Sequence, residues 1–278
     1  MRLRPLRSLP LNPRAVWSVA QEVRTAVAAF RPLVVAGAAG PASAVRAALA
    51  AGGDPDAVRD ATGRPLAAYD LDGADVLLLV VAGDAPSVED EEAVALARRK
   101  RVPVVCVLVG GEDGEARELR GVEPEDVILA RAGEPLPVER VVERIAERAG
   151  EEAYVLASKL PVLRRPVAEA IVRRFAKQNA VLGAAVFIPG ADLPALTLNQ
   201  IRMVFRIAGA YGAEIDRERA VELLAVVGAG LGFRAVARQV VAFVPGPGWA
   251  LKGGIAYGGT RALGRAAIRY FESVRSRS

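Results

Sequence analysis

The chain has 278 residues, enough for two domains that each bury a core, and 52% of them are hydrophobic. Its basic excess lies after Gly150, where 18 basic residues stand against 9 acidic ones, whereas 19 basic and 23 acidic residues precede that point. The single cysteine excludes an intrachain disulfide, and the absence of histidine removes the commonest metal ligand and general base, so we expect no metal and no cofactor.

Residues 1–31 form a basic segment followed by a predicted helix. Asn12 suits a helix cap, Pro13 suits the first turn, and apolar residues then recur at helical spacing from Ala15 to Phe30. No apolar stretch follows the basic residues up to Arg14 in the way a secretory signal requires. We therefore expect the main domain to lie in the cytoplasm.

Short apolar runs alternate with helical patterns over residues 32–150. The continuous valine and leucine run at Asp75–Val81 is typical of a parallel strand covered on both faces. The alternation predicts a doubly wound, mostly parallel α/β sheet, whose ligands would bind at loops beyond the carboxyl ends of the strands. The predicted strands are Leu33–Val35, Pro65–Tyr69, Asp75–Val81, Pro103–Val109 and Asp126–Ala130, and the predicted helices are Ser43–Ala51, Glu89–Arg101 and Pro137–Ala149.

This succession resembles the core of small Era-like GTPases from about Leu33 to Ala149. The resemblance rests on the glycine-rich turn after the first strand, on the run Asp75–Val81, and on Val104–Leu108 before an acidic loop. It implies a GTPase-like domain with nucleotide-binding loops after these strands. The nucleotide motifs of the family, however, are largely missing.

The phosphate loop has lost its key residues. The motif GxxxxGK[ST] is needed because backbone amides cradle the phosphates, the lysine neutralises them and the hydroxyl holds magnesium. Counted from Gly37, the last three positions are Ala42, Ser43 and Ala44. This departure predicts a pseudo-GTPase that does not hydrolyse GTP.

The other two motifs of the family are equally weak. Asp70-Leu71-Asp72-Gly73 fits DxxG in spacing but leaves no room for the usual switch segment before the next strand. Gly110-Gly111-Glu112-Asp113 keeps only the aspartate of NKxD, so guanine specificity is unsupported. The alternative explanation for all these loops is plain turn chemistry. The vestigial nucleotide-binding positions are Gly37, Gly40, Ser43 and Asp113.

Residues 151–278 are predicted to form an apolar, basic helical domain. A basic helical stretch runs from Glu151 to Lys177, divided by Pro161 and Pro166. The apolar runs Ala184–Gly190 and Val240–Gly246 then each end in Pro-Gly, which predicts two helical hairpins. The 14 uncharged residues from 178 to 191 are too few for a membrane-spanning helix. Further helices are predicted at Leu196–Tyr211, from Asp216 to Phe233, and at Lys252–Phe271, the last interrupted by Gly254, Gly258 and Gly264.

The region from Lys159 to Phe271 resembles the uncharacterised helical domain that bacteria append to Era-like GTPases, as in YcjF-like proteins. This resemblance implies association with a membrane and no established reaction. It supports the pseudo-GTPase interpretation of the preceding domain. The residues that carry it are Asn179-Ala180, the turns Pro189-Gly190 and Pro245-Gly246, Asp192-Leu193-Pro194, Gln200 with Met203, Tyr211-Gly212, and Thr260 with Gly264.

The leading functional prediction is a non-catalytic pseudo-GTPase scaffold, peripheral or monotopic at the inner face of the cell membrane. The basic C-terminal half suits an anionic membrane better than nucleic acid, because its charges lie beside aliphatic runs rather than stacking aromatics. The predicted membrane or partner contacts are Arg164, Arg165, Arg173, Arg174, Phe187, Phe243 and Trp249.

Two alternatives belong to other functional classes. The protein could be a soluble interaction module whose hairpins pack on a partner or on a second copy, the apolar runs being an ordinary buried core. It could also be a nucleotide-binding enzyme that uses the loops Gly37–Ser43 and Gly110–Asp113 in an unfamiliar way. No residue of the sequence is assigned a catalytic role.

Overall fold

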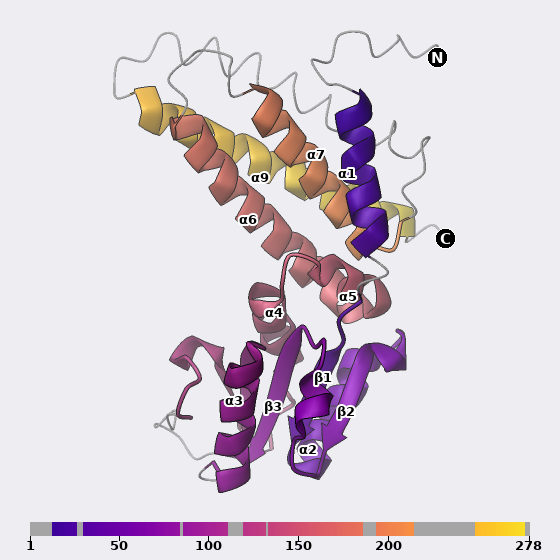
Figure 1. The fold of residues 1–278 in the computed structure, drawn as a ribbon, viewed down its shortest axis with the longest axis vertical. Helices are drawn as coiled ribbons and strands as arrows, with labels where there is room; N and C mark the ends of the chain where they lie inside the picture. The colour runs from indigo at the N-terminus through magenta and orange to yellow at the C-terminus, as the bar shows by residue number, and fades with distance from the viewer. Residues whose placement is uncertain are drawn as a thin grey trace. The chain divides into compact units, whose positions relative to one another are not determined.

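The computed structural model describes residues 13–26, 30–83, 86–110, 119–131, 133–185, 193–213 and 248–275. The chain divides into two compact units (Figure 1). An α/β unit comprises residues 29–167, and a helical unit combines the residues before 29 with those from 168 onward. The predicted fold class, an α/β sheet domain followed by an all-α domain, is confirmed.

The α/β unit is built on five parallel strands in the order β2-β1-β3-β4-β5. Val35 of β1 pairs with Asp60 of β2 on one side and with Leu78 of β3 on the other. Because β1 and β3 neighbour each other at the point where the strand order reverses, their carboxyl ends define the switch point of the sheet. The strands are β1 (Leu33–Gly37), β2 (Val58–Thr62), β3 (Val76–Ala82), β4 (Val104–Val109) and β5 (Val127–Ala130).

The second strand is not where the sequence predicts it. The predicted strand Pro65–Tyr69 is wrong: its first residues are irregular, and the 3₁₀ helix η3 (Ala68–Leu71) covers its end. The actual strand β2 is an edge strand that buries only Val58 and Ala61 and turns Arg59 and Asp60 toward more open surroundings. An edge strand needs few apolar residues, so hydropathy alone does not identify it.

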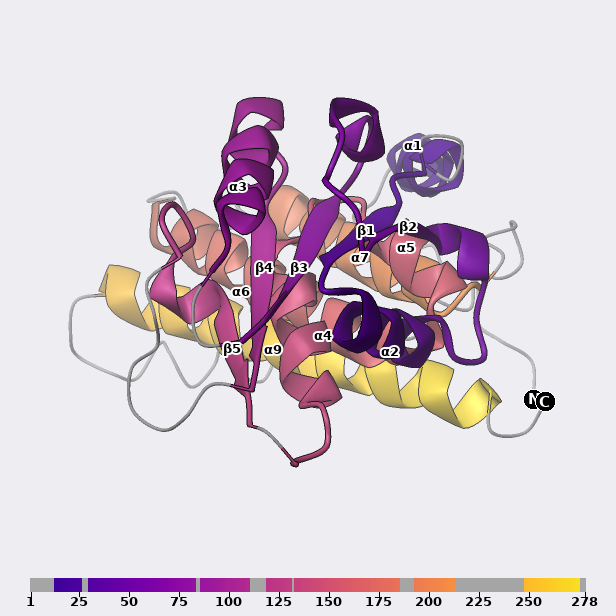
Figure 2. The ribbon, with the colours of Figure 1, turned by 90° about the horizontal axis from the view of Figure 1, so that it is seen from below.

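Helices cover both faces of the sheet. Helices α2 (Ala39–Ala50) and α4 (Val138–Arg148) lie on one face, and α3 (Val88–Lys100) lies with η3 on the other (Figure 2). Helix α3 starts with a capping box in which Ser87 and Asp90 satisfy each other's backbone amides. The core beneath α3 combines alternate strand residues with one stripe of the helix, namely Val34, Ala36, Leu77, Leu79, Val81, Cys106, Ala93, Val94 and Ala97.

Two short elements after α4 complete the α/β unit. Helix α5 (Ala153–Lys159) and the 3₁₀ helix η5 (Pro161–Leu163) pack on this unit, as do the short 3₁₀ turns η2 (Pro55–Ala57) and η4 (Pro124–Asp126). The Lys159 Nζ atom lies 2.7 Å from Asp54 Oδ2 and 4.9 Å from the centre of the Phe30 ring. A side chain at Gly53 would place its Cβ 2.4 Å from the Lys159 carbonyl oxygen, so the approach of α5 requires glycine there.

The helical unit contains α1 (Pro13–Ala26), α7 (Leu193–Ala210), α9 (Gly248–Arg275) and, from Ala168 onward, α6 (Arg164–Ala185). Helix α7 packs against both α1 and α9. Of the two prolines predicted to divide the basic stretch, only Pro161 separates helices, because Pro166 lies in the first turn of α6, where its missing amide hydrogen costs nothing.

Helix α9 runs without interruption for 28 residues, so the predicted breaks at Gly254, Gly258 and Gly264 are wrong. Two of its glycines instead permit close packing on α6. A Cβ on Gly264 would lie 2.3 Å from Val172 Cγ2, and one on Gly253 would lie 3.1 Å from the Ala180 carbonyl oxygen. Small residues thus let these two helix backbones approach each other.

None of the helices in the described parts of the chain is both long enough and apolar enough to cross a membrane.

Candidate functional site

The turn from β1 to α2 lies at the switch point, where the GTPase resemblance places a phosphate loop. Only Ala38 separates the end of β1 from the start of α2. Its amide donates to the Val80 carbonyl at 2.8 Å, and the Gly63 amide donates to the Gly37 carbonyl at 2.8 Å. The turn is therefore hydrogen-bonded to its neighbours and is too short to wrap around a phosphate chain.

The vestigial nucleotide-binding residues have different surroundings. Gly37 has a φ of +104° and lies against the backbone of Val80, where its lack of a side chain is a packing requirement. Gly40 lies in the first turn of α2, where an added Cβ would meet nothing within 4 Å, and Ser43 is exposed further along the helix. Asp113 lies outside the described residues. The structure brings the first three to one helix start without forming a cradle.

Sequence reasoning missed a second DxxG spacing, in the edge strand β2. Asp60-Ala61-Thr62-Gly63 also has the DxxG spacing, and it ends the strand beside β1. A carboxylate after such a strand holds magnesium in P-loop NTPases. The sequence contains this spacing, but the strand that carries it has too few apolar residues to be predicted from hydropathy.

Asp60 is already engaged by this chain's own groups. The Thr62 amide donates to Asp60 Oδ1 at 3.0 Å, and the Arg46 guanidinium of α2 lies with its Nε 3.4 Å from Oδ2. The hydrogen bonds from Thr62, with smaller contributions from Arg46 and Arg64, lower the pKa of Asp60. The Arg46 guanidinium thus already balances the charge of this carboxylate.

The segment after β2 is fixed by arginine contacts. Arg64 binds both carboxylate oxygens of Asp70, at 2.7 and 2.8 Å, and the Ala67 amide donates to the same carboxylate. Arg59 donates to the carbonyls of Tyr69, Asp70 and Asp72. The hydrogen bonds from Arg64 lower the pKa of the Asp70 carboxyl against the opposing effect of burial. These contacts order the segment without any ligand.

The pKa shifts predict how stability depends on pH. The carboxyls of Asp54, Asp60 and Asp70 all have pKa values below the ordinary value of about 3.9, so their contribution is complete above that pH and is lost as the pH falls below it. Burial raises the pKa of Cys106 to about 12, and the chain has no histidine. We expect the melting temperature to stay level from pH 5 to 8 and to fall below about pH 4.

Differential scanning calorimetry across pH 3 to 8 tests this expectation. The variant Asp70→Asn should show a lower melting temperature at neutral pH and a shallower acid decline, because it has no carboxylate left to protonate at that position. A steep change between pH 5.5 and 7.5 would contradict the assignment.

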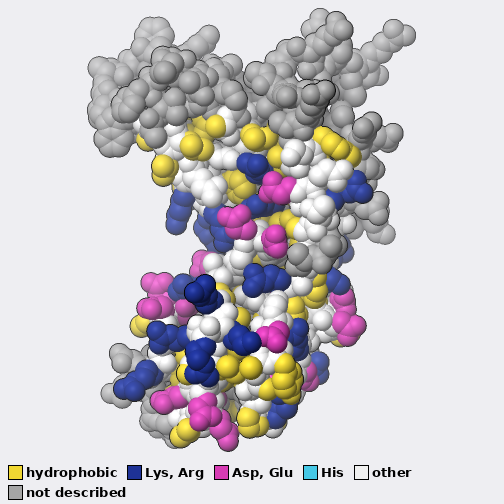
Figure 3. All heavy atoms as spheres, in the orientation of Figure 1, with side chains coloured by type: hydrophobic (Ala, Val, Ile, Leu, Met, Phe, Trp, Pro, Cys, Tyr) yellow, Lys and Arg dark blue, Asp and Glu magenta, His cyan; other side chains and the backbone are white. Residues whose placement is uncertain are grey.

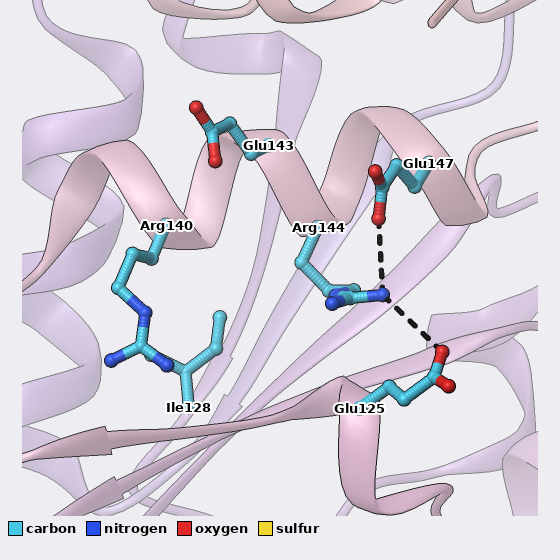
Figure 4. Close-up of a pocket in the computed structure, with 6 residues that line it drawn as sticks. All are labelled: Glu125, Ile128, Arg140, Glu143, Arg144 and Glu147. Carbon is cyan, nitrogen blue, oxygen red and sulfur yellow. Dashed lines mark ion pairs between the residues drawn. The ribbon is translucent and has the colours of Figure 1, made fainter.

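A small depression lies between α4 and β5 (Figure 4). Its volume is about 120 Å³, below the 300 to 1,000 Å³ usual for ligand pockets. Arg144 stands between Glu147, at 3.0 Å, and Glu125, at 3.9 Å, so its charge is already balanced. The depression therefore does not offer the room that a nucleotide needs. Its lining residues are Glu125, Ile128, Arg140, Glu143, Arg144 and Glu147.

The predicted basic contacts lie along α6. Arg165 is exposed, whereas Arg164, Arg173 and Arg174 are half-buried, and the Arg164 guanidinium donates to the Ser158 carbonyl at 3.1 Å. Basic and acidic side chains are mixed over the face of the molecule in Figure 3. All four predicted arginines belong to this one helix. Of the predicted aromatic contacts, Trp249 lies in the first turn of α9, and Phe187 and Phe243 lie outside the described residues.

A buried polar cluster joins three helices of the helical unit. The Thr260 hydroxyl of α9 accepts from Asn179 Nδ2 of α6 at 3.0 Å and from Gln200 Nε2 of α7 at 3.3 Å, and it donates to the Ala256 carbonyl at 2.7 Å. Asn199 Nδ2 donates to the Asn179 side-chain oxygen at 3.1 Å. One hydroxyl thus fixes the register of α6, α7 and α9. Sequence reasoning quoted three of these residues as points of resemblance without seeing that they meet.

Comparison with known proteins identifies the second half of the chain. Residues 149–277 match the family model described as "Domain of unknown function (DUF697)". No curated protein matches the chain. The matched family fits the predicted YcjF-like helical domain, and it includes α5 and η5, which pack on the α/β unit. The resemblance of the α/β unit to Era-like GTPases stays a prediction, and residues 149–277 form a DUF697 domain.

Proposed function

We propose that this protein is a non-catalytic pseudo-GTPase scaffold, in which a GTPase-like α/β unit without nucleotide chemistry carries a DUF697 domain. The observation that carries the proposal is the β1–α2 turn, whose single residue Ala38 donates its amide to Val80. Phosphate binding at such a turn depends on several free backbone amides and on a lysine. No lysine follows this turn, and the amide of its single residue is already bonded to Val80.

Two further features support a scaffold that needs no nucleotide. The Arg46 guanidinium faces Asp60, the carboxylate of the DxxG spacing in β2. The segment after β2, which nucleotide contacts order in signalling GTPases, is ordered here by Arg59 and Arg64. The α/β unit would therefore present the same surface at all times.

Isothermal titration with GTP, GDP and ATP in the presence of magnesium tests the proposal. We expect no binding heat and no phosphate release. The combined variant Ala42→Gly, Ser43→Lys, Ala44→Ser restores the missing motif letters, and it should still bind nothing because the turn itself lacks the loop. Saturable binding of any of these nucleotides by the unaltered chain would overturn the proposal.

We further propose that the scaffold works at an anionic membrane surface on the cytoplasmic side. The supporting observation is the charge asymmetry, a net charge of −4 up to Gly150 and of +9 after it, with Arg165 exposed on α6. Most of the described apolar residues of α7, from Leu196 to Ala210, are buried within the helical unit, so we expect lipid contact in this part of the chain to be mainly electrostatic.

Co-sedimentation with vesicles containing phosphatidylserine tests the membrane contact. Charge reversal of Arg164, Arg165, Arg173 and Arg174 to Glu should abolish sedimentation with the vesicles. Reversal of four exposed basic residues at the end of α3, Arg98, Arg99, Lys100 and Arg101, is the matched control and should leave part of the binding. If circular dichroism shows that both variants are folded and both lose vesicle binding equally, the attraction between protein and vesicle is not specific to α6. No sedimentation of the unaltered chain would favour the soluble interaction module.

A further inference from the structure

Helix α1 is an amphipathic helix seated on α7. Its buried residues recur at helical spacing, whereas Ser18, Glu22, Arg24 and Thr25 are exposed. The residues that it buries are Val16, Val19, Ala20, Val23 and Ala26, each at most 8% exposed. Helix α1 thus covers part of α7 with a single apolar stripe.

One carboxylate fixes the position of α1 on α7. Glu22 Oε2 lies 3.3 Å from Arg202 Nε, and Glu22 Oε1 lies 3.2 Å from Arg206 Nη2, one turn further along α7. The Arg206 guanidinium also lies 5.5 Å from the centre of the Phe175 ring of α6. The pairing sets both the orientation and the register of a helix placed on this surface.

The surface beneath α1 belongs to a domain that does not include α1. The DUF697 match begins at residue 149, whereas α1 ends at Ala26. Helix α7 is buried around most of its circumference, with Ile201, Met203, Val204 and Phe205 at most 1% exposed. A helix that is apolar almost all round needs cover on every side. The domain therefore relies on a helix from outside its own matched sequence.

We propose that this surface of α7, with Arg202 and Arg206 at its rim, is a helix-binding groove that accepts α1 of a second copy as well as the α1 of its own chain. Each copy has one α1 and one groove, so reciprocal exchange of α1 gives a closed symmetric dimer. This dimer uses the same α1–α7 contact as the single chain. Six residues separate Ala26 from Leu33, and a chain of that length reaches about 20 Å when extended. The charge pattern selects a helix with a carboxylate at the position of Glu22.

Subunit exchange of the unaltered chain tests the proposal without risk to folding. Unlabelled and ¹⁵N-labelled protein are mixed at high concentration and analysed by native mass spectrometry. We expect dimers of mixed label whose share rises with concentration. A strictly monomeric protein at all concentrations would overturn the proposal.

Charge reversal then locates the contact. The variants Glu22→Arg and Arg202→Glu each place like charges together, and Arg206 is spared because it packs on Phe175. A mixture of the two variants should contain more dimer of one variant with the other than either variant forms with itself. The altered α1 of one copy then fits the altered groove of the other. The variant carrying both changes in one chain is the control and should recover the behaviour of the original protein. If neither substitution changes the amount of dimer, the dimer contact lies elsewhere and the assignment is overturned.

Discussion

The variant Gly37→Ala is expected to lose about 4 kcal/mol or more of the free energy of unfolding, enough to unfold the α/β unit. A Cβ at this position would lie 2.0 Å from the Val80 carbonyl oxygen and within 2.9 Å of two more atoms of its backbone. Neither strand can move away, because β1 and β3 are paired along their length in the centre of the sheet. The φ of +104° adds strain for any residue with a side chain.

Gly40→Ala is the matched control, three residues away in the same glycine-rich turn. No atom lies within 4 Å of the added methyl group, and the residue is helical, so this variant should be as stable as the original or more stable by about 0.5 to 1 kcal/mol. Urea unfolding followed by circular dichroism measures both. The two variants distinguish a packing role of Gly37 from a phosphate-binding role of the loop. A phosphate-binding role would require glycine at both positions. A Gly37→Ala variant as stable as the original would refute the packing explanation.

Replacing Thr260 by valine is expected to destabilise the helical unit by about 2 to 4 kcal/mol, although the two side chains have almost the same shape. The hydroxyl accepts hydrogen bonds from Asn179 and Gln200, and all three residues are at most 2% exposed. Valine leaves both amide donors facing a methyl group where water cannot reach them. A buried donor without a partner loses its full hydration energy.

The variant Thr260→Ser keeps the hydroxyl and should lose no more than about 1 kcal/mol, the value of one buried methyl group. Both tryptophans of the chain, Trp17 and Trp249, belong to the helical unit, so tryptophan fluorescence in urea reports on this unit rather than on the sheet. Equal stability of the valine and serine variants would show that the polar cluster does not hold α6, α7 and α9 in register.

Hydropathy identified the strands other than β2, most clearly the central strands that are buried on both faces. Val76–Ala82 and Val104–Val109 lie inside the sheet, where every residue must be apolar, and their sequences are runs of valine and leucine. Strand β2 lies at an edge and carries Arg59 and Asp60, whose partners are an arginine of α2 and carbonyls beyond the strand. Such partners are set by tertiary structure, so a sequence pattern cannot reveal them.

The candidate site was predictable to a similar degree. The sequence alone shows that Ala42, Ser43 and Ala44 replace the motif residues of the phosphate loop, and this predicts that nucleotide binding is lost. The shortness of the turn and the contact of Arg46 with Asp60 required the structure. The meeting of Asn179, Gln200 and Thr260 could not be predicted either, since they lie up to 81 residues apart in the sequence.

The position of α1 has a consequence for folding during synthesis. Glu22 and Arg202 are 180 residues apart, and the whole α/β unit is encoded between them. At a synthesis rate of about 5 to 20 residues per second, the apolar stripe of α1 waits about 10 to 40 s on the ribosome before α7 exists to cover it. The sheet can fold in that interval, whereas α1 remains a target for chaperones. Newly made α1 is also free at the time when neighbouring chains on one messenger RNA are closest together, which favours its capture by another copy.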